Sequence, residues 1–203
     1  NVLMYSELLT EVAQGEREKE YAGEVYRQGK KLESLIGALV KMSRLETGIF
    51  QYEQKETAYQ TVIRKAVEQA RPKADAKDLS IVVKEGAHYR ASIDEKWVVE
   101  AVYNILDNAI KYSGEGTEIS VEEFSYELFS GIRITDQGMG VCEEEIPLLF
   151  GRFYRGKQVH DKEGVGVGLF LAREIVEGNG GYIRVKSELK KGSTFDVCFP
   201  NIT

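Results

Sequence analysis

Residues 104–112 have the sequence Asn-Ile-Leu-Asp-Asn-Ala-Ile-Lys-Tyr, and no other stretch of the chain says more about its architecture. Asn104, Asn108 and Lys111 are spaced by four and three residues, so they share one face of a predicted helix. Two amides and an ammonium on one stripe suit a magnesium–phosphate group, because amide oxygens bind hard cations and an ammonium binds phosphate. Taken alone, the stripe is equally consistent with a solvated helix face.

After Gly48 the sequence alternates short strand-like segments with helices, so we place a domain boundary between residues 1–48 and 49–203. We expect helices at 59–71, 94–111 and 167–177, with the first ending before Pro72 and Asp94 capping the second. We expect strands at residues 80–84, 89–93, 118–123, 130–135, 182–187 and 194–199. Strands in adjacent pairs with helices between them predict an α+β fold, one sheet with helices on one face.

The first fifty residues predict a helical hairpin. Apolar residues recur at steps of three and four from Val2 to Val12 and again from Tyr21 to Met42, with a break near Gly15. The second stripe would extend roughly 45 Å and is wider than a two-helix seam needs. We therefore expect two hairpins to form a four-helix bundle in a homodimer. The alternative is a hairpin that packs on its own second domain.

A second motif, Asp136-Gln-Gly-Met-Gly140, follows a predicted strand. Glycines there let the backbone approach a ligand closely, and a carboxylate at a strand end can accept a hydrogen bond. An adenine amino group is the obvious donor. The alternative is an ordinary turn, because Asp-x-Gly sequences are common at turns.

Two further motifs lie close together in the sequence. Phe150-Gly-Arg-Phe-Tyr-Arg155 precedes a polar run and suits either the rim of a mobile lid over phosphate or a surface loop pinned by a hydrophobic cluster. Gly164-Val-Gly-Val-Gly-Leu169 opens a helix, where backbone N–H groups favour an anion. Its spacing differs from the dinucleotide fingerprint, and no Lys-Ser/Thr pair follows as in a P-loop.

Each motif is ambiguous alone, but their order is specific. The four stretches resemble, in sequence order, the N, first-glycine, F and second-glycine boxes of the sensor histidine kinases of two-component systems. Residues 43–48, 177–181 and 192–195 also fit that family, so the resemblance covers essentially the whole chain. It implies the two-layer α+β ATP-binding sandwich shared with gyrase-type ATPases, preceded by an α-helical hairpin that forms a bundle on dimerisation.

The resemblance also implies a set of residues that face Mg²⁺ and the phosphates of ATP. Asn108 would be the magnesium ligand, with Asn104 beside it on the phosphates. Lys111 and Arg155 would contact phosphate. Asn104, Lys111 and Arg155 are the residues that this resemblance implies for catalysis.

On the other side of the implied site, Tyr112 would line the adenine and Asp136 would bind its amino group. The remaining residues expected to bind nucleotide are Gly138, Gly140, Gly164, Gly166, Val167, Gly168, Leu169 and Thr194.

Asn104 stands where hydrolytic relatives of the family, such as gyrase, place a glutamate that activates water. An amide cannot act as a general base, so we expect phosphoryl transfer to a histidine, for relay to an aspartate on a response regulator receiver domain. His88 and His160 both lack the family's His-Glu/Asp-x-x-x-Pro context. We therefore expect the acceptor to be absent and the chain to be unable to autophosphorylate alone. A gyrase-like ATPase and a nucleotide-dependent binding module are the alternatives.

Composition limits the other possibilities. A formal net charge of −6 argues against nucleic acid as a main partner. No stretch approaches the roughly 18 apolar residues of a membrane span. Two cysteines in 203 residues favour a reducing compartment over a disulfide scaffold. We expect a soluble chain, the cytoplasmic portion of a sensor attached to the inner membrane.

Overall fold

The computed structural model describes residues 1–13, 15–46, 52–86, 88–156 and 165–202. The chain forms two units, a helical hairpin within residues 1–47 and an α/β unit that contains residues 48–162 and 166–203. Each unit is described by itself. The predicted boundary between residues 48 and 49 lies outside the described residues. Within the described parts of the chain, no helix is long and apolar enough to cross a membrane.

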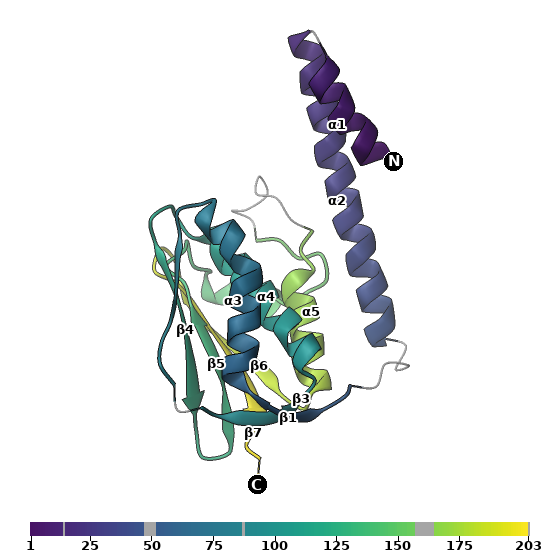
Figure 1. The fold of residues 1–203 in the computed structure, drawn as a ribbon. Helices are drawn as coiled ribbons and strands as arrows, with labels where there is room; N and C mark the ends of the chain where they lie inside the picture. The colour runs from purple at the N-terminus through teal and green to yellow at the C-terminus, as the bar shows by residue number, and fades with distance from the viewer. Residues whose placement is uncertain (14, 47–51, 87, 157–164, 203) are drawn as a thin grey trace. The chain divides into compact units, whose positions relative to one another are not determined.

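The hairpin consists of α1 (Val2–Val12) and α2 (Glu16–Glu46), in agreement with the predicted apolar spacing (Figure 1). The two helices pack closely at Gly29, where a Cβ would lie 2.7 Å from the Leu3 side chain. Ser6 is buried between them and donates a hydrogen bond to the Leu3 carbonyl at 2.8 Å. Small residues therefore set the spacing of the hairpin.

The α/β unit is built on a mixed five-stranded sheet with the strand order β2-β4-β5-β7-β6. Its strands are β2 (Ser80–Val83), β4 (Glu118–Ser125), β5 (Phe129–Thr135), β6 (Tyr182–Glu188) and β7 (Gly192–Pro200). β2 and β4 are parallel, and the other pairs are antiparallel. Two short strands, β1 (Lys55–Ala58) and β3 (Arg90–Ile93), pair with each other outside this sheet.

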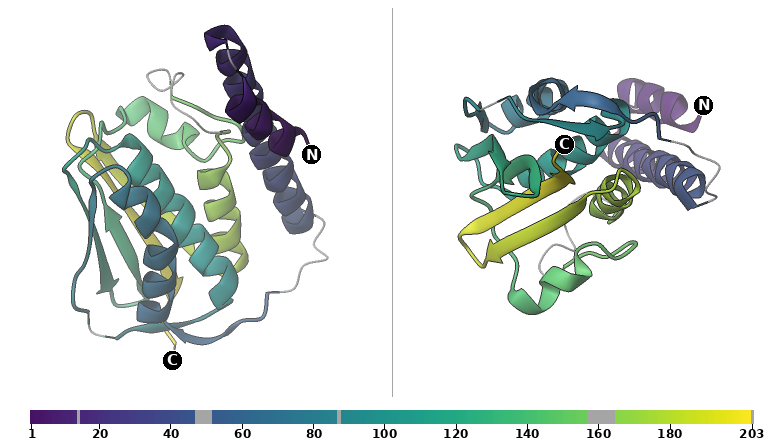
Figure 2. Two further views of the ribbon diagram at one scale, coloured as in Figure 1. Left: turned by 45° about the horizontal axis from the view of Figure 1, so that its top comes forward. Right: turned by 90° about the horizontal axis from the view of Figure 1, so that it is seen from below.

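Three helices cover one face of the sheet, as Figures 1 and 2 show. They are α3 (Tyr59–Asp75), α4 (Glu95–Tyr112) and α5 (Gly168–Gly178). Alternate strand residues such as Ile132, Ile134 and Val197 point toward these helices and are fully buried. This arrangement confirms the predicted two-layer α+β fold, and most predicted strands and helices lie within a few residues of their observed bounds.

The prediction that the first helix ends before Pro72 is wrong, because α3 continues to Asp75. Proline lacks an N–H and so cannot bond the carbonyl of Glu68. Pro72 lies near the end of the helix, however, where few intrahelical bonds remain to be made. Ala70 and Ala74, on either side of it, are buried against the rest of the unit at 0% and 1% exposure. Burial of these two alanines therefore stabilises the helix beyond Pro72.

Asp94 joins three segments at the start of α4. Its carboxylate accepts a hydrogen bond from the Trp97 N–H at 3.3 Å, which confirms the predicted N-cap, and another from the Glu53 N–H at 3.0 Å. The Asp94 N–H donates to the side chain of Asn179 at 2.7 Å, and Asn179 in turn donates to the Ile175 carbonyl of α5. The start of α4 is thus fixed to the end of α5 and to the segment that precedes β1.

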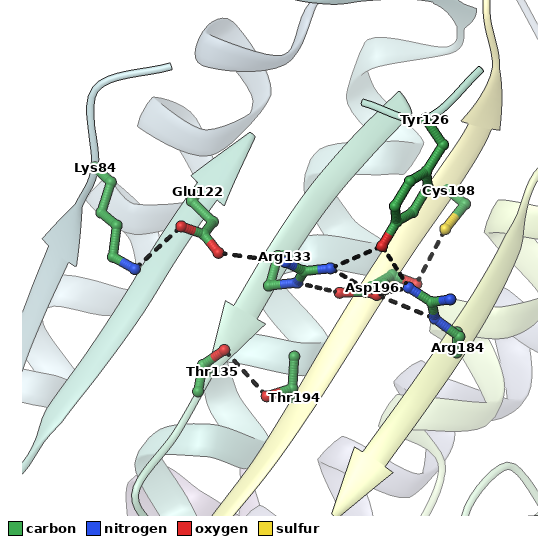
Figure 3. Close-up of polar contacts among 9 residues, drawn as sticks. All are labelled: Lys84, Glu122, Tyr126, Arg133, Thr135, Arg184, Thr194, Asp196 and Cys198. Carbon is green, nitrogen blue, oxygen red and sulfur yellow. Dashed lines mark hydrogen bonds and ion pairs between the residues drawn. The ribbon is translucent and has the colours of Figure 1, made fainter. Parts of the chain in front are cut away.

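The face of the sheet away from the helices carries a network of charges (Figure 3). Arg133 on β5 and Arg184 on β6 both donate to Asp196 on β7, at distances down to 2.5 Å. The Tyr126 hydroxyl accepts from both guanidinium groups. Burial alone would raise the pKa of Asp196, but the two arginines hold it below its usual value. The ionised carboxylate therefore ties three neighbouring strands together.

On the helix-covered face, Tyr59 at the start of α3 is completely buried and stacks on Phe199, with ring centroids 6.3 Å apart. Its hydroxyl bonds the carbonyl and the hydroxyl of Ser130, each at 3.1 Å. Burial raises the pKa of Tyr59 from 10.0 to about 12. The folded chain therefore keeps this phenol protonated at pH values where the unfolded chain loses the proton.

We predict that Tyr59→Phe changes how stability depends on alkaline pH. The contribution of this group is complete below pH 10 and is lost as the pH rises from 10 to 12, because only the unfolded chain ionises there. The free energy of unfolding of the wild type should fall relative to that of the variant by roughly 2–3 kcal/mol across this window. Urea denaturation at a series of pH values measures the difference, with Tyr21→Phe, on the exposed surface of α2, as the control. Parallel curves for wild type and Tyr59→Phe would contradict the prediction.

Candidate nucleotide-binding site

α4 carries the predicted polar stripe. Asn104, Asn108 and Lys111 are each partly exposed along one side of the helix. The residues between them on the opposite side are buried against the sheet: Ile105, Leu106, Ala109 and Ile110. Packing of the apolar face therefore fixes the direction in which the two amides and the ammonium point. The Lys111 ammonium lies 5.0 Å from the ring centroid of Tyr112.

Asn104 carries a buried polar atom of the stripe. Its Nδ2 is buried and has no hydrogen-bond partner among the residues the structure describes. Its Oδ1 lies 3.5 Å from the position that a Cβ would take at Gly168, the first residue of α5. A buried amide donor without a partner is costly unless a ligand completes it. The Asn104 side chain thus faces the start of α5, and its Nδ2 can still donate a hydrogen bond.

Asp136 directly follows β5 and is also buried, at 7% exposure. Its Oδ1 accepts hydrogen bonds from the N–H groups of Gly138 at 2.8 Å and Ser193 at 3.2 Å. Burial raises the pKa of Asp136, although these two bonds oppose the shift. In the described parts of the chain no hydrogen bond reaches Oδ2. One oxygen is therefore held by the backbone while the other can accept from an amino group.

The turn after Asp136 requires its glycines. Gly140 has φ +63°, and a Cβ there would lie 1.9 Å from the Glu188 carbonyl oxygen. A Cβ at Gly138 would lie 2.8 Å from the carbonyl oxygen of Tyr112. The Met139 N–H donates to that same carbonyl at 3.3 Å. The predicted motif at 136–140 therefore packs directly on the end of α4.

The start of α5 faces the other end of the polar stripe. Gly166 has φ +76°, and a Cβ there would lie 2.6 Å from the Tyr154 carbonyl oxygen, so this glycine lets two motifs meet. Val167 is the N-cap residue of α5 and provides no side-chain hydrogen bond. The first N–H groups of the helix, from Gly168 and Leu169 onward, lack intrahelical partners. With the helix dipole they form a site that favours an anion.

The segment 150–155 is attached to α5 through aromatic contacts. The guanidinium of Arg152 lies 4.8 Å from the ring centroid of Phe170, and that of Arg173 lies 5.7 Å from the centroid of Phe150. Arg155, the last residue of this segment, is partly exposed. The predicted site residue Gly164 lies outside the described residues.

One predicted residue is not brought into this group. The Thr194 hydroxyl bonds the Thr135 hydroxyl at 3.2 Å, as Figure 3 shows. Strand alternation places Asp136, the residue after Thr135, on the other face of the sheet. Ser193, the residue before Thr194, takes this place because its N–H holds Asp136. Ser193 was not predicted as a site residue, because the contact uses its backbone amide. Strand alternation indicates only the face, since Ser193 shares it with Phe195, which is buried under the helices.

The residues fit a nucleotide bound with Mg²⁺. Amide oxygens at Asn104 and Asn108 suit a hard cation, and Lys111 and the start of α5 suit phosphates. The unpartnered Nδ2 of Asn104 and the close approach at Gly168 are the features of this structure that such a ligand would complete. Asp136, at the other end of the group, matches the amino group of a base.

The match of a family model agrees with this geometry. The model of the histidine kinase-, DNA gyrase B- and HSP90-like ATPases matches residues 93–203. That span contains more than half of the chain and all the site residues described above. The chain therefore belongs to the family of histidine kinase-, DNA gyrase B- and HSP90-like ATPases.

Its curated relatives place it on the histidine-kinase branch. Sensor histidine kinase YvrG of Bacillus subtilis is 32% identical over 187 residues, which make up 91% of this chain and 32% of the relative. Sensor-like histidine kinase SenX3 of Mycolicibacterium smegmatis is 28% identical over 184 residues, or 90% of this chain and 48% of the relative. The α/β unit is thus the ATPase catalytic domain found in two-component sensor kinases. The chain spans less than half the length of these two relatives.

Solved structures give the same fold. The mycobacterial sensor histidine kinase MprB matches 73% of this chain and 97% of its own, with a TM-score of 0.63 and 26% identity. Full-length ShkA, solved in complex with AMPPNP, matches 100% of this chain and 42% of its own, with a TM-score of 0.77. At 21% identity the second comparison shows the fold alone.

We predict that Asp136→Asn does not lower stability at neutral pH. Because the pKa of Asp136 is raised, the folded chain binds this proton more tightly than the unfolded chain, so its stability decreases as the pH rises above the usual value of 3.8. The amide keeps an oxygen for the two backbone N–H groups and carries no buried charge. Urea denaturation between pH 4 and pH 7 should therefore show that the free energy of unfolding of the variant rises relative to that of the wild type as the pH increases. A variant that becomes progressively less stable than the wild type over that range would contradict the prediction.

Proposed function

We propose that this chain binds Mg-ATP between α4, the turn at 136–140 and the start of α5, and transfers the γ-phosphoryl group to a histidine on another segment or polypeptide. The observation that carries the proposal is Asn104, whose buried and unpartnered amide faces the first residue of α5. An anion at the helix start and a cation on the asparagine stripe would meet there.

Each side of the site has its own task in this proposal. Asn108 holds Mg²⁺, which when bound neutralises charge on the transferring phosphates. Asn104, Lys111 and Arg155 hold the phosphates in position. Tyr112 lines the base, and the free oxygen of Asp136 accepts a hydrogen bond from its amino group. Ser193 replaces Thr194 in the proposed set, because its amide orients Asp136.

A kinase is favoured over a hydrolase by the chemistry beside α5. Activation of water requires a general base at the attacking position. Asn104 is the stripe residue that faces the start of α5. Its carboxamide cannot take up a proton at neutral pH. Positioning and charge neutralisation can still promote transfer to an acceptor that is brought to the site.

The hairpin supports assembly into a homodimer. Three apolar residues of α2 at heptad spacing remain about half exposed in the single chain: Val25 at 49%, Leu32 at 57% and Leu39 at 51%. Ile36 and Val40 widen this stripe. A second hairpin would bury such a surface in a four-helix bundle. A histidine phosphorylated in this assembly would pass its phosphoryl group to an aspartate of a response regulator.

We predict that the chain binds Mg-AMPPNP with a dissociation constant on the order of tens of micromolar, and that Asn108→Ala or Asp136→Ala weakens binding at least about tenfold, or about 1.4 kcal/mol. Titration calorimetry measures both. Asn201→Ala is the matched control, because the side-chain amide of Asn201 donates to the carbonyls of Tyr126 and Glu127 at the surface, away from the candidate site. Equal affinities for all four proteins would place the nucleotide elsewhere.

We further predict that the chain with labelled ATP forms no phosphohistidine by itself but phosphorylates a separately supplied phosphoacceptor helix of a sensor kinase. His88 is exposed in a loop, outside any helix that could present it. Acid-labile incorporation on the supplied helix, lost with Asn108→Ala, is the expected result. Label on the isolated chain would disprove the first statement. Nucleotide binding without any transfer would favour a binding module.

A further inference from the structure

The C-terminal end of α4 has backbone carbonyl groups that need hydrogen-bond partners from outside the helix. Lys111 and Tyr112 lie there, at the junction of the phosphate side and the base side of the site. The last four carbonyl groups of a helix have no intrahelical partner. A shift of this end by less than an ångström would move both side chains, so the way in which its carbonyls are held determines the geometry of the site.

Every carbonyl at this end has a partner. The Ser113 N–H closes the helix on the Ala109 carbonyl at 3.0 Å, and the Met139 N–H bonds the Tyr112 carbonyl at 3.3 Å. The remaining two carbonyls, of Ile110 and Lys111, accept from the ammonium of Lys77 at 2.7 and 3.0 Å, and so does the carbonyl of the C-cap residue Ser113 at 2.6 Å. An ammonium has three N–H donors, and its charge suits the negative end of the helix dipole.

Lys77 is itself fixed on both sides by the turn between α3 and β2. Its N–H and that of Leu79 both bond the Ala74 carbonyl, at 3.0 and 2.9 Å, and the Leu79 side chain is buried. The Asp78 carbonyl accepts from the Gly116 N–H at 2.9 Å, beyond the end of α4. The ammonium therefore comes from a rigid turn that is also joined to the segment following the helix.

We infer that Lys77 is a positioning residue for the nucleotide site, acting through the end of α4 and without contact to the nucleotide. By satisfying three carbonyls it leaves the Tyr112 carbonyl to Met139, and so sets the end of the helix against the turn at 136–140. This inference rests on the proposed function, because it assigns to Lys77 the placement of Lys111 and Tyr112 around Mg-ATP.

Loss of the ammonium has a defined consequence. Lys77→Met keeps most of the apolar stem but leaves three carbonyls to water, which cannot hold them in one arrangement. Lys77→Arg keeps the charge, but a planar guanidinium cannot direct three donors at three carbonyls as an ammonium does. Both variants should therefore disturb the contact between Tyr112 and Met139, the methionine variant more.

The matched control is Lys65→Met. Lys65 lies on α3, whereas Lys77 lies in the turn that follows it, and both side chains reach α4. Lys65 does so at the opposite end of α4, where it pairs with Glu95, so the variant removes the same type of side chain without touching the site. General weakening of the α3–α4 contact would appear in both methionine variants, whereas a positioning effect would appear only at Lys77.

Two measurements test the inference, both at a temperature where circular dichroism shows folded protein. Titration with Mg-AMPPNP should give about tenfold weaker binding for Lys77→Met, about threefold for Lys77→Arg and less than about twofold for Lys65→Met. Hydrogen exchange of the Met139 amide should be faster in the Lys77 variants and unchanged in Lys65→Met. General destabilisation would instead accelerate the most protected amides of the sheet.

The outcomes separate the inference from the proposed function. Wild-type protein that fails to bind Mg-AMPPNP overturns the proposed function, while the Met139 amide still shows whether Lys77 holds the end of α4. Normal binding by Lys77→Met overturns the inference, and so does weak binding with an unchanged Met139 amide. If Lys77→Met does not fold, the same two measurements on Lys77→Arg decide between these outcomes.

Discussion

The antiparallel pairing of β5 with β7 is the constraint on which the rest of the α/β unit depends. It sets Thr135 opposite Thr194, so that Asp136 and Ser193 come next and bond each other through the backbone at 2.9 Å and through the carboxylate at 3.2 Å. A slip of one residue would turn the alternating side chains over. Asp136 would then leave the helix-covered face, and the candidate site would lose the carboxylate that we propose accepts from the base.

The two faces of this pair stabilise the register in different ways. Toward the helices, fully buried Ile132 and Val197 lie opposite each other. Toward the other side, Arg133 and Asp196 form an ion pair at the adjacent position, which Arg184 extends to β6. Apolar burial supplies most of the stabilisation. The charges add specificity, because a shifted register would leave the carboxylate buried without its two arginines.

Much of this architecture could be predicted from the sequence, because it depends on periodicity and on motif order. The apolar spacing of α4 predicted the C-terminal end of this helix to within one residue. The order of the four motifs in the sequence indicated the candidate site. β1 was missed because its sequence, Lys-Glu-Thr-Ala, has no apolar alternation. α3 was predicted too short because proline disfavours a helix locally, whereas burial of Ala74 stabilises the helix beyond Pro72.

The parts of the site that could not be predicted depend on backbone groups and on distant segments. Ser193 acts through an amide that every residue except proline possesses, so its side chain gives no signal. Thr194 was expected in the site, but strand alternation turns it away. Lys77 lies more than thirty residues from the carbonyls it holds. Its role exists only once α3, β2 and the end of α4 are packed together.

The position of β7 in the sequence has a consequence for biosynthesis. β7 follows every other strand of the sheet, yet it lies between β5 and β6. During synthesis on the ribosome, one edge of β5 therefore stays unpaired until the 57 residues that follow Asp136, up to Ser193, have been made. Such an edge is open to association with other chains, and Asp136 lacks its second amide until that point. A nascent or prematurely terminated chain would thus be aggregation-prone, and the candidate site is complete only after Ser193 has been made.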